Sequence, residues 1–306
     1  MSKKLLFRLF ALVAAMMCAL GMQAAVEAYA NYTPSNTTLT FYYDNQRSSR
    51  TGTTYDLNIG YNYPDWYTDG TYFNVTNVVF DPSFAVARPT STIYWFFGLS
   101  NLQSITGLEY LNTSEVTDMA WMFFYCTNLT SLDLSHFNTS KVNSMYNMLG
   151  YCQSLTSLDL SSFNTSQVVS MSSMFDYCAN LQTIYVGDGW NTAAVTISQD
   201  MFKDCTSLVG GKGTTYDAIH VDASYAHIDG GPSNPGYFTE KNASLRGDVN
   251  GDGSVSISDV TALIDYLLSG DASAINTDAA DCNRDNGVSI ADVTVLIDYL
   301  LSGTWN

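Results

Sequence analysis

Two short acidic segments near the end of the chain are almost duplicates of each other. Both place oxygen-bearing side chains at positions 1, 3, 5 and 12 of an EF-hand-like loop, with a backbone carbonyl at position 7 and a serine at the water-binding position 9. Ca²⁺, a hard cation that binds about seven oxygen atoms, requires such a set. A polar turn without a ligand would not repeat these residues in the same phase, so we predict two bound Ca²⁺ ions. The predicted ligands are Asp248, Asn250, Asp252, Ser254, Ser256 and Asp259 in the first loop and Asp281, Asn283, Asp285, Gly287, Ser289 and Asp292 in the second, with Gly253 and Asn286 as the turn residues.

An amphipathic helix is predicted directly after each loop. Apolar residues recur at i, i+3, i+4, i+7 and i+8 in both segments, which is the spacing of one buried stripe. Gly270 and Gly303 stand where a helix commonly ends. Because about sixty residues enclose only a small core, we expect bound Ca²⁺ to supply much of the folding free energy. The stripe residues are Val260, Leu263, Ile264, Leu267 and Leu268 in the first helix and Val293, Leu296, Ile297, Leu300 and Leu301 in the second.

A loop followed by a single helix, given twice, resembles a dockerin type I domain. In that family the module binds a cohesin domain on another protein, and loop positions 10 and 11 help to select the partner. The resemblance therefore assigns partner binding to Ile257, Ser258, Ile290 and Ala291. These residues depart from the Ser-Thr pair that is familiar in the family. The resemblance implies a Ca²⁺ scaffold and a cohesin-type partner without specifying which cohesin.

A repeated unit occupies the middle of the chain. Residues 129–152 and 155–178 agree at most positions, and looser copies cover residues 102–128 and 181–207. The alternating leucines at the start of each unit predict a short strand. The apolar residues that follow lie within one arc of about 120° at about 100° per residue, so we predict a short helix with one buried face. In the unit 155–178 this face comprises Val168, Met171, Met174, Phe175 and Cys178, with Thr165 and Ser166 as candidate helix caps.

The predicted fold class of this region is an α/β repeat. One unit cannot bury both its leucines and its helix face, whereas stacked units with strands ~4.8 Å apart share a continuous core. We predict a leucine-rich-repeat-like solenoid, with a strand plus a short helix per 26-residue unit, followed by a small all-α Ca²⁺-binding dockerin domain. The units resemble the BspA-like leucine-rich repeats of bacterial surface proteins over most of residues 31–240.

The chain begins with the features of a secretory signal peptide. Basic residues precede an apolar run of about a dozen residues, and small residues near Ala25 and Ala30 offer cleavage sites. The run is shorter than the ~20 residues that span a membrane, so we expect an exported protein without a transmembrane segment. Residues 39–43 and 55–58 are predicted to pair as a hairpin. The expected divisions are a signal peptide (1–30), a β-rich cap with a degenerate first repeat (31–101), the repeats (102–208), a second cap (209–238), a linker (239–246) and the dockerin-like domain (247–306).

Four cysteines lie about one repeat apart and should form a column. Stacking would place neighbouring backbones ~5 Å apart, which is close enough for disulfides. Side chains in a column point in parallel, however, and these lie on the apolar face of each unit, so buried thiols are the favoured interpretation. A metal site is disfavoured because a linear ladder of sulfur atoms does not form a tetrahedron. The four residues are Cys126, Cys152, Cys178 and Cys205.

Composition and motifs argue against several classes of function. The 306 residues include 12 Lys and Arg against 29 Asp and Glu, a formal net charge of −17. Nucleic acids and anionic membranes require clustered basic residues, so neither is expected as a partner. We find no nucleophile elbow, no zinc-spaced histidines and no phosphate-binding loop. We therefore assign no catalytic residue and expect no enzyme activity, although paired carboxylates for glycoside cleavage stay open as an alternative.

Two parts of the repeat region offer candidate ligand surfaces. Aromatic pairs in the amino-terminal cap could stack on sugar rings or pack in the core. Small polar residues on the outward strand positions could bind a ligand through hydrogen bonds or form a plain solvated surface. The aromatic pairs are Trp66-Tyr67, Tyr72-Phe73 and Tyr94-Trp95, and the polar rows are Thr130, Ser131 and Asp133 with Thr156, Ser157 and Asp159.

Taken together, the sequence predicts a secreted, non-catalytic recognition or adhesion protein. Its solenoid would present a surface to a host-surface protein or glycan, and its Ca²⁺-loaded tail would attach it to a cohesin-type partner. Such linkage raises the local concentration of the solenoid near whatever the partner holds. The alternative is a carbohydrate-active or glycan-binding subunit of a dockerin–cohesin complex in polysaccharide catabolism. A purely structural surface-layer role is a third interpretation. The expected location is extracellular, either released or attached to the cell surface.

Overall fold

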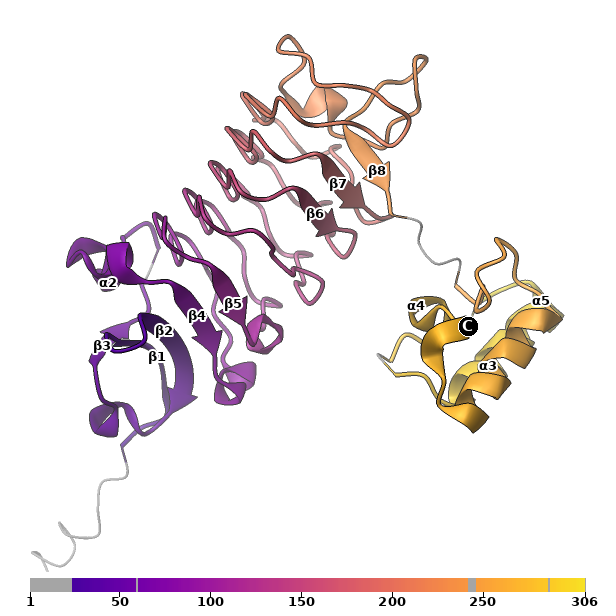
Figure 1. The fold of residues 1–306 in the computed structure, drawn as a ribbon, viewed down its shortest axis with the longest axis horizontal. Helices are drawn as coiled ribbons and strands as arrows, with labels where there is room; N and C mark the ends of the chain where they lie inside the picture. Colours follow the sequence, from indigo (N-terminus) through magenta and orange to yellow (C-terminus); the bar gives the residue numbers. More distant parts are fainter. Residues whose placement is uncertain (1–23, 59, 242–245, 286, 306) are drawn as a thin grey trace, which may run out of the picture. The chain divides into compact units, whose positions relative to one another are not determined.

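The computed structural model describes residues 24–58, 60–241, 246–285 and 287–305 (Figure 1). The chain divides into two compact units, Met1–Thr239 and Glu240–Asn306. Most of the predicted signal peptide and part of the predicted linker lie outside the described residues. Within the described ranges, no helix combines the length and the apolar character needed to cross a membrane.

A five-stranded sheet with the strand order β3-β1-β2-β4-β5 forms the beginning of the first unit. β1 (Glu27–Thr33) pairs antiparallel with both β2 (Thr38–Asp44) and β3 (Thr53–Asp56). The sheet continues in parallel from β2 to β4 (Asn77–Phe80) and then to β5 (Ser104–Thr106). The sheet therefore changes from antiparallel hairpins to parallel stacking as the repeats begin.

The predicted pairing of residues 39–43 with residues 55–58 is wrong. These segments form β2 and β3, and β1 lies between them in the sheet. This strand begins four residues before residue 31, where the cap was expected to start. Tyr29 and Ala30 are fully buried in the sheet. The pairing was missed because these residues had been assigned to the signal peptide.

Successive turns of the chain then stack in parallel through the repeat region (Figure 1). A column of parallel bridges joins residues 26 or 27 positions apart, namely Ser91, Asp118, Ser144, Ser170 and Ile197. On another side of the stack, β6 (Ser157–Leu160) pairs in parallel with β7 (Thr183–Val186). β8 (Phe238–Glu240) completes this three-stranded sheet in the order β6-β7-β8.

The helix predicted in each repeat is absent, since residues 102–208, all of which are described, contain no α-helix. Alternate N–H groups bond to the next turn of the stack instead of to the fourth residue before them. Thus Met145 and Asn147 donate to Ser170 and Ser172, while Met148 donates back only to Met145. Left-handed residues, such as Asn147 (φ 53°) and Tyr151 (φ 61°), permit this alternation. Tight turns bring every third or fourth residue inward, so they produce the same apolar spacing as a helix.

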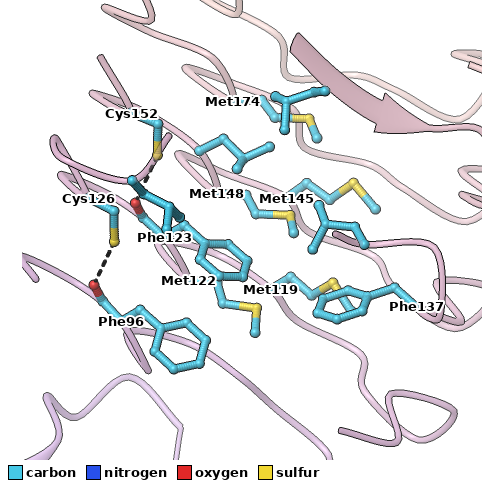
Figure 2. Close-up of a cluster of buried hydrophobic side chains, with 14 of the residues drawn as sticks. Phe96, Met119, Met122, Phe123, Cys126, Phe137, Met145, Met148, Cys152 and Met174 are labelled. Carbon is cyan, nitrogen blue, oxygen red and sulfur yellow. Dashed lines mark hydrogen bonds between the residues drawn. The ribbon is translucent and has the colours of Figure 1, made fainter. Parts of the chain in front are cut away.

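The predicted inner face is confirmed as core even though its backbone is not helical. Val168, Met171, Met174, Phe175 and Cys178 are all fully buried. Figure 2 shows how methionine and phenylalanine side chains from successive turns pack against one another in this core. Each such side chain contributes about 1.5–3 kcal/mol when it is removed from water.

The cysteine column is buried and reduced, as predicted. All five cysteines among the described residues are free. Each repeat thiol donates to a backbone carbonyl in the preceding turn, as Cys126 does to Phe96 and Cys152 to Phe123, both at 3.2 Å (Figure 2). Burial raises the pKa of the Cys178 thiol to about 12. These thiols therefore act as small apolar side chains that satisfy one carbonyl each.

The predicted helix cap Thr165 has a different role. It is fully buried, and its Oγ1 both accepts from the N–H of Asn191 (2.7 Å) and donates to that residue's carbonyl (2.6 Å). Thr113 and Thr139 make the same pair of bonds to the next turn. A buried threonine column thus joins the turns at the corner after each leucine strand.

The second unit consists of two longer helices with short connecting elements. α3 (Ile257–Ser269) and α5 (Ile290–Ser302) pack against each other, and α4 (Thr277–Ala280), which was not predicted, lies between them in the chain. Both helices end at a left-handed glycine, as expected. The remaining short helices of the protein are α2 (Asp65–Thr68) and the 3-10 turns η1 (Arg47–Ser49), η2 (Thr71–Asn74), η3 (Pro82–Val86), η4 (Leu108–Tyr110), η5 (Ala223–Tyr225) and η6 (Ala272–Ala274).

Candidate functional site

The last predicted ligand of the first loop is also part of the start of α3. Ser256 caps this helix, and its N–H donates to Asp259 Oδ2 at 2.8 Å, which completes a capping box. The other carboxylate oxygen of Asp259 accepts from the N–H of Asn250 at 3.0 Å. Asp259 is fully buried. The Asp259 carboxylate therefore connects the first turn of α3 to Asn250 near the start of the loop and to Ser256 near its end.

Two other predicted ligands of the first loop, Asp248 and Asn250, accept hydrogen bonds from the backbone of the same loop. Asp248 accepts from the N–H groups of Asp252 and Gly253, both at 2.9 Å. Asn250 Oδ1 accepts from the N–H of Asp252, also at 2.9 Å. Gly253 has a φ of 86°, which a residue with a side chain rarely adopts. This conformation agrees with the sharp turn that the sequence predicts at Gly253, position 6 of the loop.

Where it is described, the second loop repeats the bonds that backbone N–H groups make to the carboxylates of the first. Asp292 accepts from the N–H groups of Asn283 (2.9 Å) and Ser289 (2.8 Å), and it is fully buried. Asp285 donates its N–H to Asp281 Oδ1 at 3.1 Å. Arg284 has a φ of 59°, matching Gly251 (72°) in the first loop. The expected turn residue Asn286 lies outside the described residues.

The donor set of both loops fits a hard divalent cation. Asp259 and Asp292 are buried carboxylates, and neither takes part in an ion pair among the described residues. An uncompensated buried charge is costly, so a bound cation would relieve both sites. In the described residues no three His, Cys, Asp or Glu side chains already form a closed metal site. The acidic side chains of the described loop residues therefore do not converge on one point in this structure, and Asn250 and Asn283 add uncharged oxygen atoms to the two sets.

Ser254 and Gly287 occupy position 7 of the two loops. Their N–H groups donate to Asp252 Oδ1 (2.9 Å) and Asp285 Oδ1 (3.0 Å), so each position 7 lies directly beside the carboxylate at position 5. Ser256 and Ser289 at position 9 are the caps of α3 and α5. Each loop is therefore continuous with the helix that follows it.

Both helices carry an exposed apolar face that the sequence prediction had placed partly in the core. Leu268 and Leu301 are each 82% exposed, and Ile264 and Ile297 are each 38% exposed. That part of the predicted stripe is wrong because each helix packs on only one long neighbour and buries a narrower seam, centred on Leu263 and Leu296. The two apolar helix faces consist of Ile257, Ile264 and Leu268 on α3 and Ile290, Ile297 and Leu301 on α5.

The four predicted partner-binding residues lie at the exposed starts of the helices. Ile257 and Ile290 are 72% and 71% exposed, and both belong to the apolar helix faces. Ser258 and Ala291 are also exposed. Ser258 Oγ accepts from Asn250 Nδ2 at 3.0 Å, so this residue is joined to the loop. The sequence did not indicate Leu268 and Leu301 as partner-binding residues, because only the structure shows that these leucines are exposed.

The first unit has a groove of about 620 Å³ beside β5 and β6, lined by both polar and apolar residues. It is lined by residues 104–109, 130–133, His136, Ser157 and Asp159, and it contains most of the predicted polar rows. Thr156 is not part of its lining. The charged or ionisable lining residues are Glu109, Asp133, His136 and Asp159.

The aromatic pairs of the amino-terminal cap divide between core and surface. Trp66 and Trp95 are buried. Tyr67 and Tyr72 are partly exposed and contact each other in a tilted arrangement with ring centroids 4.3 Å apart, and Phe73 contacts Tyr72 in the same way. These rings therefore cover one another in part, while Phe73 stays 57% exposed.

Comparisons with known proteins match the two units separately. Residues 90–213 match the family model described as Mycoplasma protein of unknown function, DUF285, and residues 246–301 match the dockerin type I domain. Among solved structures, a leucine-rich cell surface protein from Faecalibacterium prausnitzii A2-165 aligns with 18% identity and a TM-score of 0.31. The alignment covers 62% of this chain and 54% of that one, so this chain spans about half the length of that protein. No curated protein matches the sequence.

The second unit is thus similar to dockerin type I domains, which bind calcium and attach to cohesin partners. The duplicated oxygen-rich loops and the exposed helix starts agree with this similarity. The DUF285 match covers most of the stacked turns of the first unit and brings no function with it.

Proposed function

We propose that this protein is a secreted, non-catalytic recognition protein that attaches through its carboxyl-terminal unit to a cohesin-type partner. The observation that carries the proposal is the pair of equivalent loops, each ending in a fully buried carboxylate, Asp259 or Asp292, that also completes the capping box of a helix. In this proposal each loop binds one Ca²⁺ ion, and the repeat unit presents a surface to a second ligand.

The loop residues link ion binding to the shape of the docking unit. When bound, Ca²⁺ supplies the positive charge that three carboxylates in each loop lack. Asp259 holds the first turn of α3 through its capping box, and Asp292 does the same for α5. Mutual repulsion among the carboxylates in the ion-free state would loosen these helix starts. Ion binding and the presentation of the apolar helix faces are therefore coupled.

The apolar helix faces are the proposed contact with the partner. A leucine that is 82% exposed, such as Leu268 or Leu301, gains free energy when a partner buries it. Ile257 and Ile290 extend each face to the helix start, beside the ion-binding loop. The proposal thus adds Ile264, Leu268, Ile297 and Leu301 to the partner-binding residues that the sequence suggested.

The first unit is proposed to be a solenoid of 26-residue leucine-rich units related to the BspA-like repeats. The column of bridges from Ser91 to Ile197 supports this proposal. In this proposal each unit contains a strand segment and a series of tight turns, in place of the strand and short helix that the sequence predicted. Export is proposed from the amino-terminal signal features. Cleavage is placed near Ala25, because a cut after Ala30 would remove Tyr29 and Ala30 from the core.

The proposed function is tested with the mature protein and a panel of cohesin domains. Surface plasmon resonance in CaCl₂ and in EGTA should show binding to at least one cohesin only in CaCl₂. The same protein should release no sugar from a panel of labelled polysaccharides. Turnover of any of these substrates would replace the proposal with the carbohydrate-active alternative, and equal cohesin binding in both buffers would contradict the Ca²⁺-dependent attachment.

A further inference from the structure

A series of aromatic rings lies on the tight turns of the first unit, directly after the column of parallel bridges. Four successive turns contribute rings to it. The rings contact one another with centroids 4.6–6.2 Å apart, and Phe124 joins the rings of neighbouring turns. We call this surface the aromatic strip, and its members are Tyr94, Trp121, Tyr125, Tyr146, Tyr151 and Tyr177. The strip therefore runs along the direction in which the turns stack.

The middle of the aromatic strip is open to solvent. Tyr125 is 45% exposed and Tyr146 is 37% exposed. Tyr146 meets the Trp121 ring edge to face, with an interplanar angle of 86°, and the ring contacts of Tyr125 are tilted. No described ring stacks flat on either of these tyrosines, so part of each ring face is free to contact a ligand.

The backbone of the aromatic strip favours residues other than those it carries. Trp121 (φ 60°), Tyr125 (φ 64°) and Tyr151 (φ 61°) are left-handed, a conformation that Gly, Asn and Asp adopt more readily than bulky residues. The equivalent positions of other turns do carry such residues, namely Gly98, Asn147, Asp200 and Asp204. The turn therefore forms without a ring, and rings held there at a cost in backbone free energy indicate a separate role.

Two oxygen atoms beside the strip accept no hydrogen bond from the described residues. Asn147 is only 5% exposed, and its Oδ1 is one of these atoms. It lies against Gly150, because a Cβ added to this glycine would come within 2.8 Å of Oδ1 and within 3.1 Å of the Phe124 ring. The other atom is Oδ1 of Asp176, which occupies the position of Gly150 in the next turn. Both are acceptors, so a ligand that supplies hydroxyl donors would satisfy them.

The chemistry of the aromatic strip favours a neutral polysaccharide as the ligand. Its six side chains carry no formal charge at neutral pH, so they offer no ion pair to a charged polymer. A sugar ring has an apolar C–H face that packs on an aromatic ring, and its hydroxyl groups donate to oxygen acceptors. A lipid lacks such donors along its chain and would leave the two acceptors unpaired. Neighbouring turns lie ~4.8 Å apart, so a ligand that repeats along its length can contact several rings at once.

We propose that the aromatic strip binds a neutral polysaccharide chain that runs along the stacked turns. Trp121, Tyr125 and Tyr146 form the centre of the contact, and sugar hydroxyl groups donate to the acceptors beside Gly150. This assignment rests on the proposed role of the first unit as a recognition surface, and it names the class of ligand and the residues that contact it.

Affinity electrophoresis of the full mature protein tests this assignment, in native gels that contain xyloglucan, mixed-linkage β-glucan, galactomannan or soluble starch. At least one of these should slow the wild type relative to a gel without polysaccharide. In the variant Tyr125→Asn with Tyr146→Ser the Kd should rise about tenfold or more. The matched control Tyr185→Ser removes a partly exposed tyrosine of β7, outside the strip, and should leave the Kd unchanged.

The two substitutions are chosen so that the turns keep their structure. Asn suits the left-handed backbone at position 125, and Ser172 is the natural residue at the position equivalent to Tyr146 in the next turn. The melting temperature of the double variant should therefore stay close to that of the wild type. Equal retardation of the double variant and the wild type, or no retardation by any of the four polysaccharides, would overturn the proposal.

Further measurements separate this ligand from other occupants of the strip. Polygalacturonate, an anionic polysaccharide, should bind more weakly than the best neutral one, and tighter binding of it would overturn the assignment. Sedimentation without polysaccharide should show a monomer. A dimer that the double variant abolishes would show that a second copy of the chain covers the rings, which would also overturn it. Cohesin binding in CaCl₂ is measured on the same samples. If it persists while no polysaccharide binds, only this assignment falls and the proposed attachment stands.

Discussion

The guanidinium of Arg246 lies over the indole ring of Trp305, with its carbon 4.3 Å from the ring centroid. The Trp305 ring stacks on Tyr299 of α5 at 3.9 Å, and Arg246 Nε donates to the carbonyl of Cys282 at 2.7 Å. The two ends of the carboxyl-terminal unit are therefore held together beside the second loop. This contact adds packing to a core that is small.

Trp305→Ala should destabilise the Ca²⁺-loaded carboxyl-terminal unit. The substitution removes a stacked ring and a cation–π contact, which we expect to cost about 1–3 kcal/mol. Thermal unfolding in CaCl₂, followed by the helical circular dichroism signal, measures the change. Thr304→Ala is the matched control and should have little effect. An unchanged unfolding midpoint for Trp305→Ala would mean that the ends do not stabilise the unit.

The repeat thiols should be unreactive in the folded protein. Cys126, Cys152, Cys178 and Cys205 are buried and donate to carbonyls, and burial raises their pKa, so little thiolate forms. Labelling with a thiol reagent at neutral pH should be negligible in native buffer and complete in guanidinium chloride. Complete labelling in native buffer would show that the column is open to solvent, and absence of labelling after unfolding would reveal disulfides.

Asp176→Asn should stabilise the first unit at neutral pH. Burial raises the pKa of Asp176 to about 6, and its Oδ1 has no hydrogen-bond partner among the described residues. An unfolded Asp titrates near ~3.9, so the folded state favours the neutral carboxyl. The stability that the neutral Asp176 carboxyl contributes is complete below about pH 4 and is lost as the pH rises through about 6.

Calorimetry at a series of pH values measures this effect. The melting temperature of Asp176→Asn should exceed that of the wild type at pH 7.5 and should equal it at pH 4. The exposed Asp188→Asn variant is the control for a general charge effect. Identical pH profiles for Asp176→Asn and the wild type would show that this carboxyl is solvated in the folded protein.

Leu268→Asp combined with Leu301→Asp should abolish cohesin binding without unfolding the unit. Both leucines are 82% exposed, so the substitutions cost little in the free protein but place charges in the proposed contact. Affinity should fall at least a hundredfold, while the helical signal in CaCl₂ stays unchanged. Thr261→Asp with Ser269→Asp adds the same charge at other exposed positions of α3 and tests for a general electrostatic effect. Unchanged affinity of the double leucine variant would exclude these faces as the contact.

The sequence predicted which residues of the repeats lie inside but not the backbone that places them there. Met171, Met174 and Cys178 are buried as expected. Inward positions three or four residues apart arise both from a helix and from tight turns bonded to the next layer. The left-handed residues that distinguish the two, such as Tyr151 and Tyr177, are not glycines, so nothing in the sequence marked them.

The loops of the carboxyl-terminal unit were predictable because their chemistry is local in sequence. Asp248 and Asp259 both accept hydrogen bonds from N–H groups of the same loop, and their spacing in the sequence was enough to predict that they belong to one loop. The exposure of Leu268 was not predictable, because it depends on how many neighbours α3 has in three dimensions. The strand at Glu27–Thr33 was missed because its first four residues had been assigned to the signal peptide, whose cleavage sites are marked by the same small residues, Ala28 and Ala30.

The central claim is that paired Ca²⁺ sites shape the docking unit, and calorimetric titration of the mature protein with CaCl₂ tests it most directly. We predict two ions bound per chain, with a gain in helical signal that is lost in Asp248→Ala with Asp281→Ala, together with cohesin binding. A stoichiometry of zero, or the same helical signal in EGTA and in CaCl₂, would contradict the account.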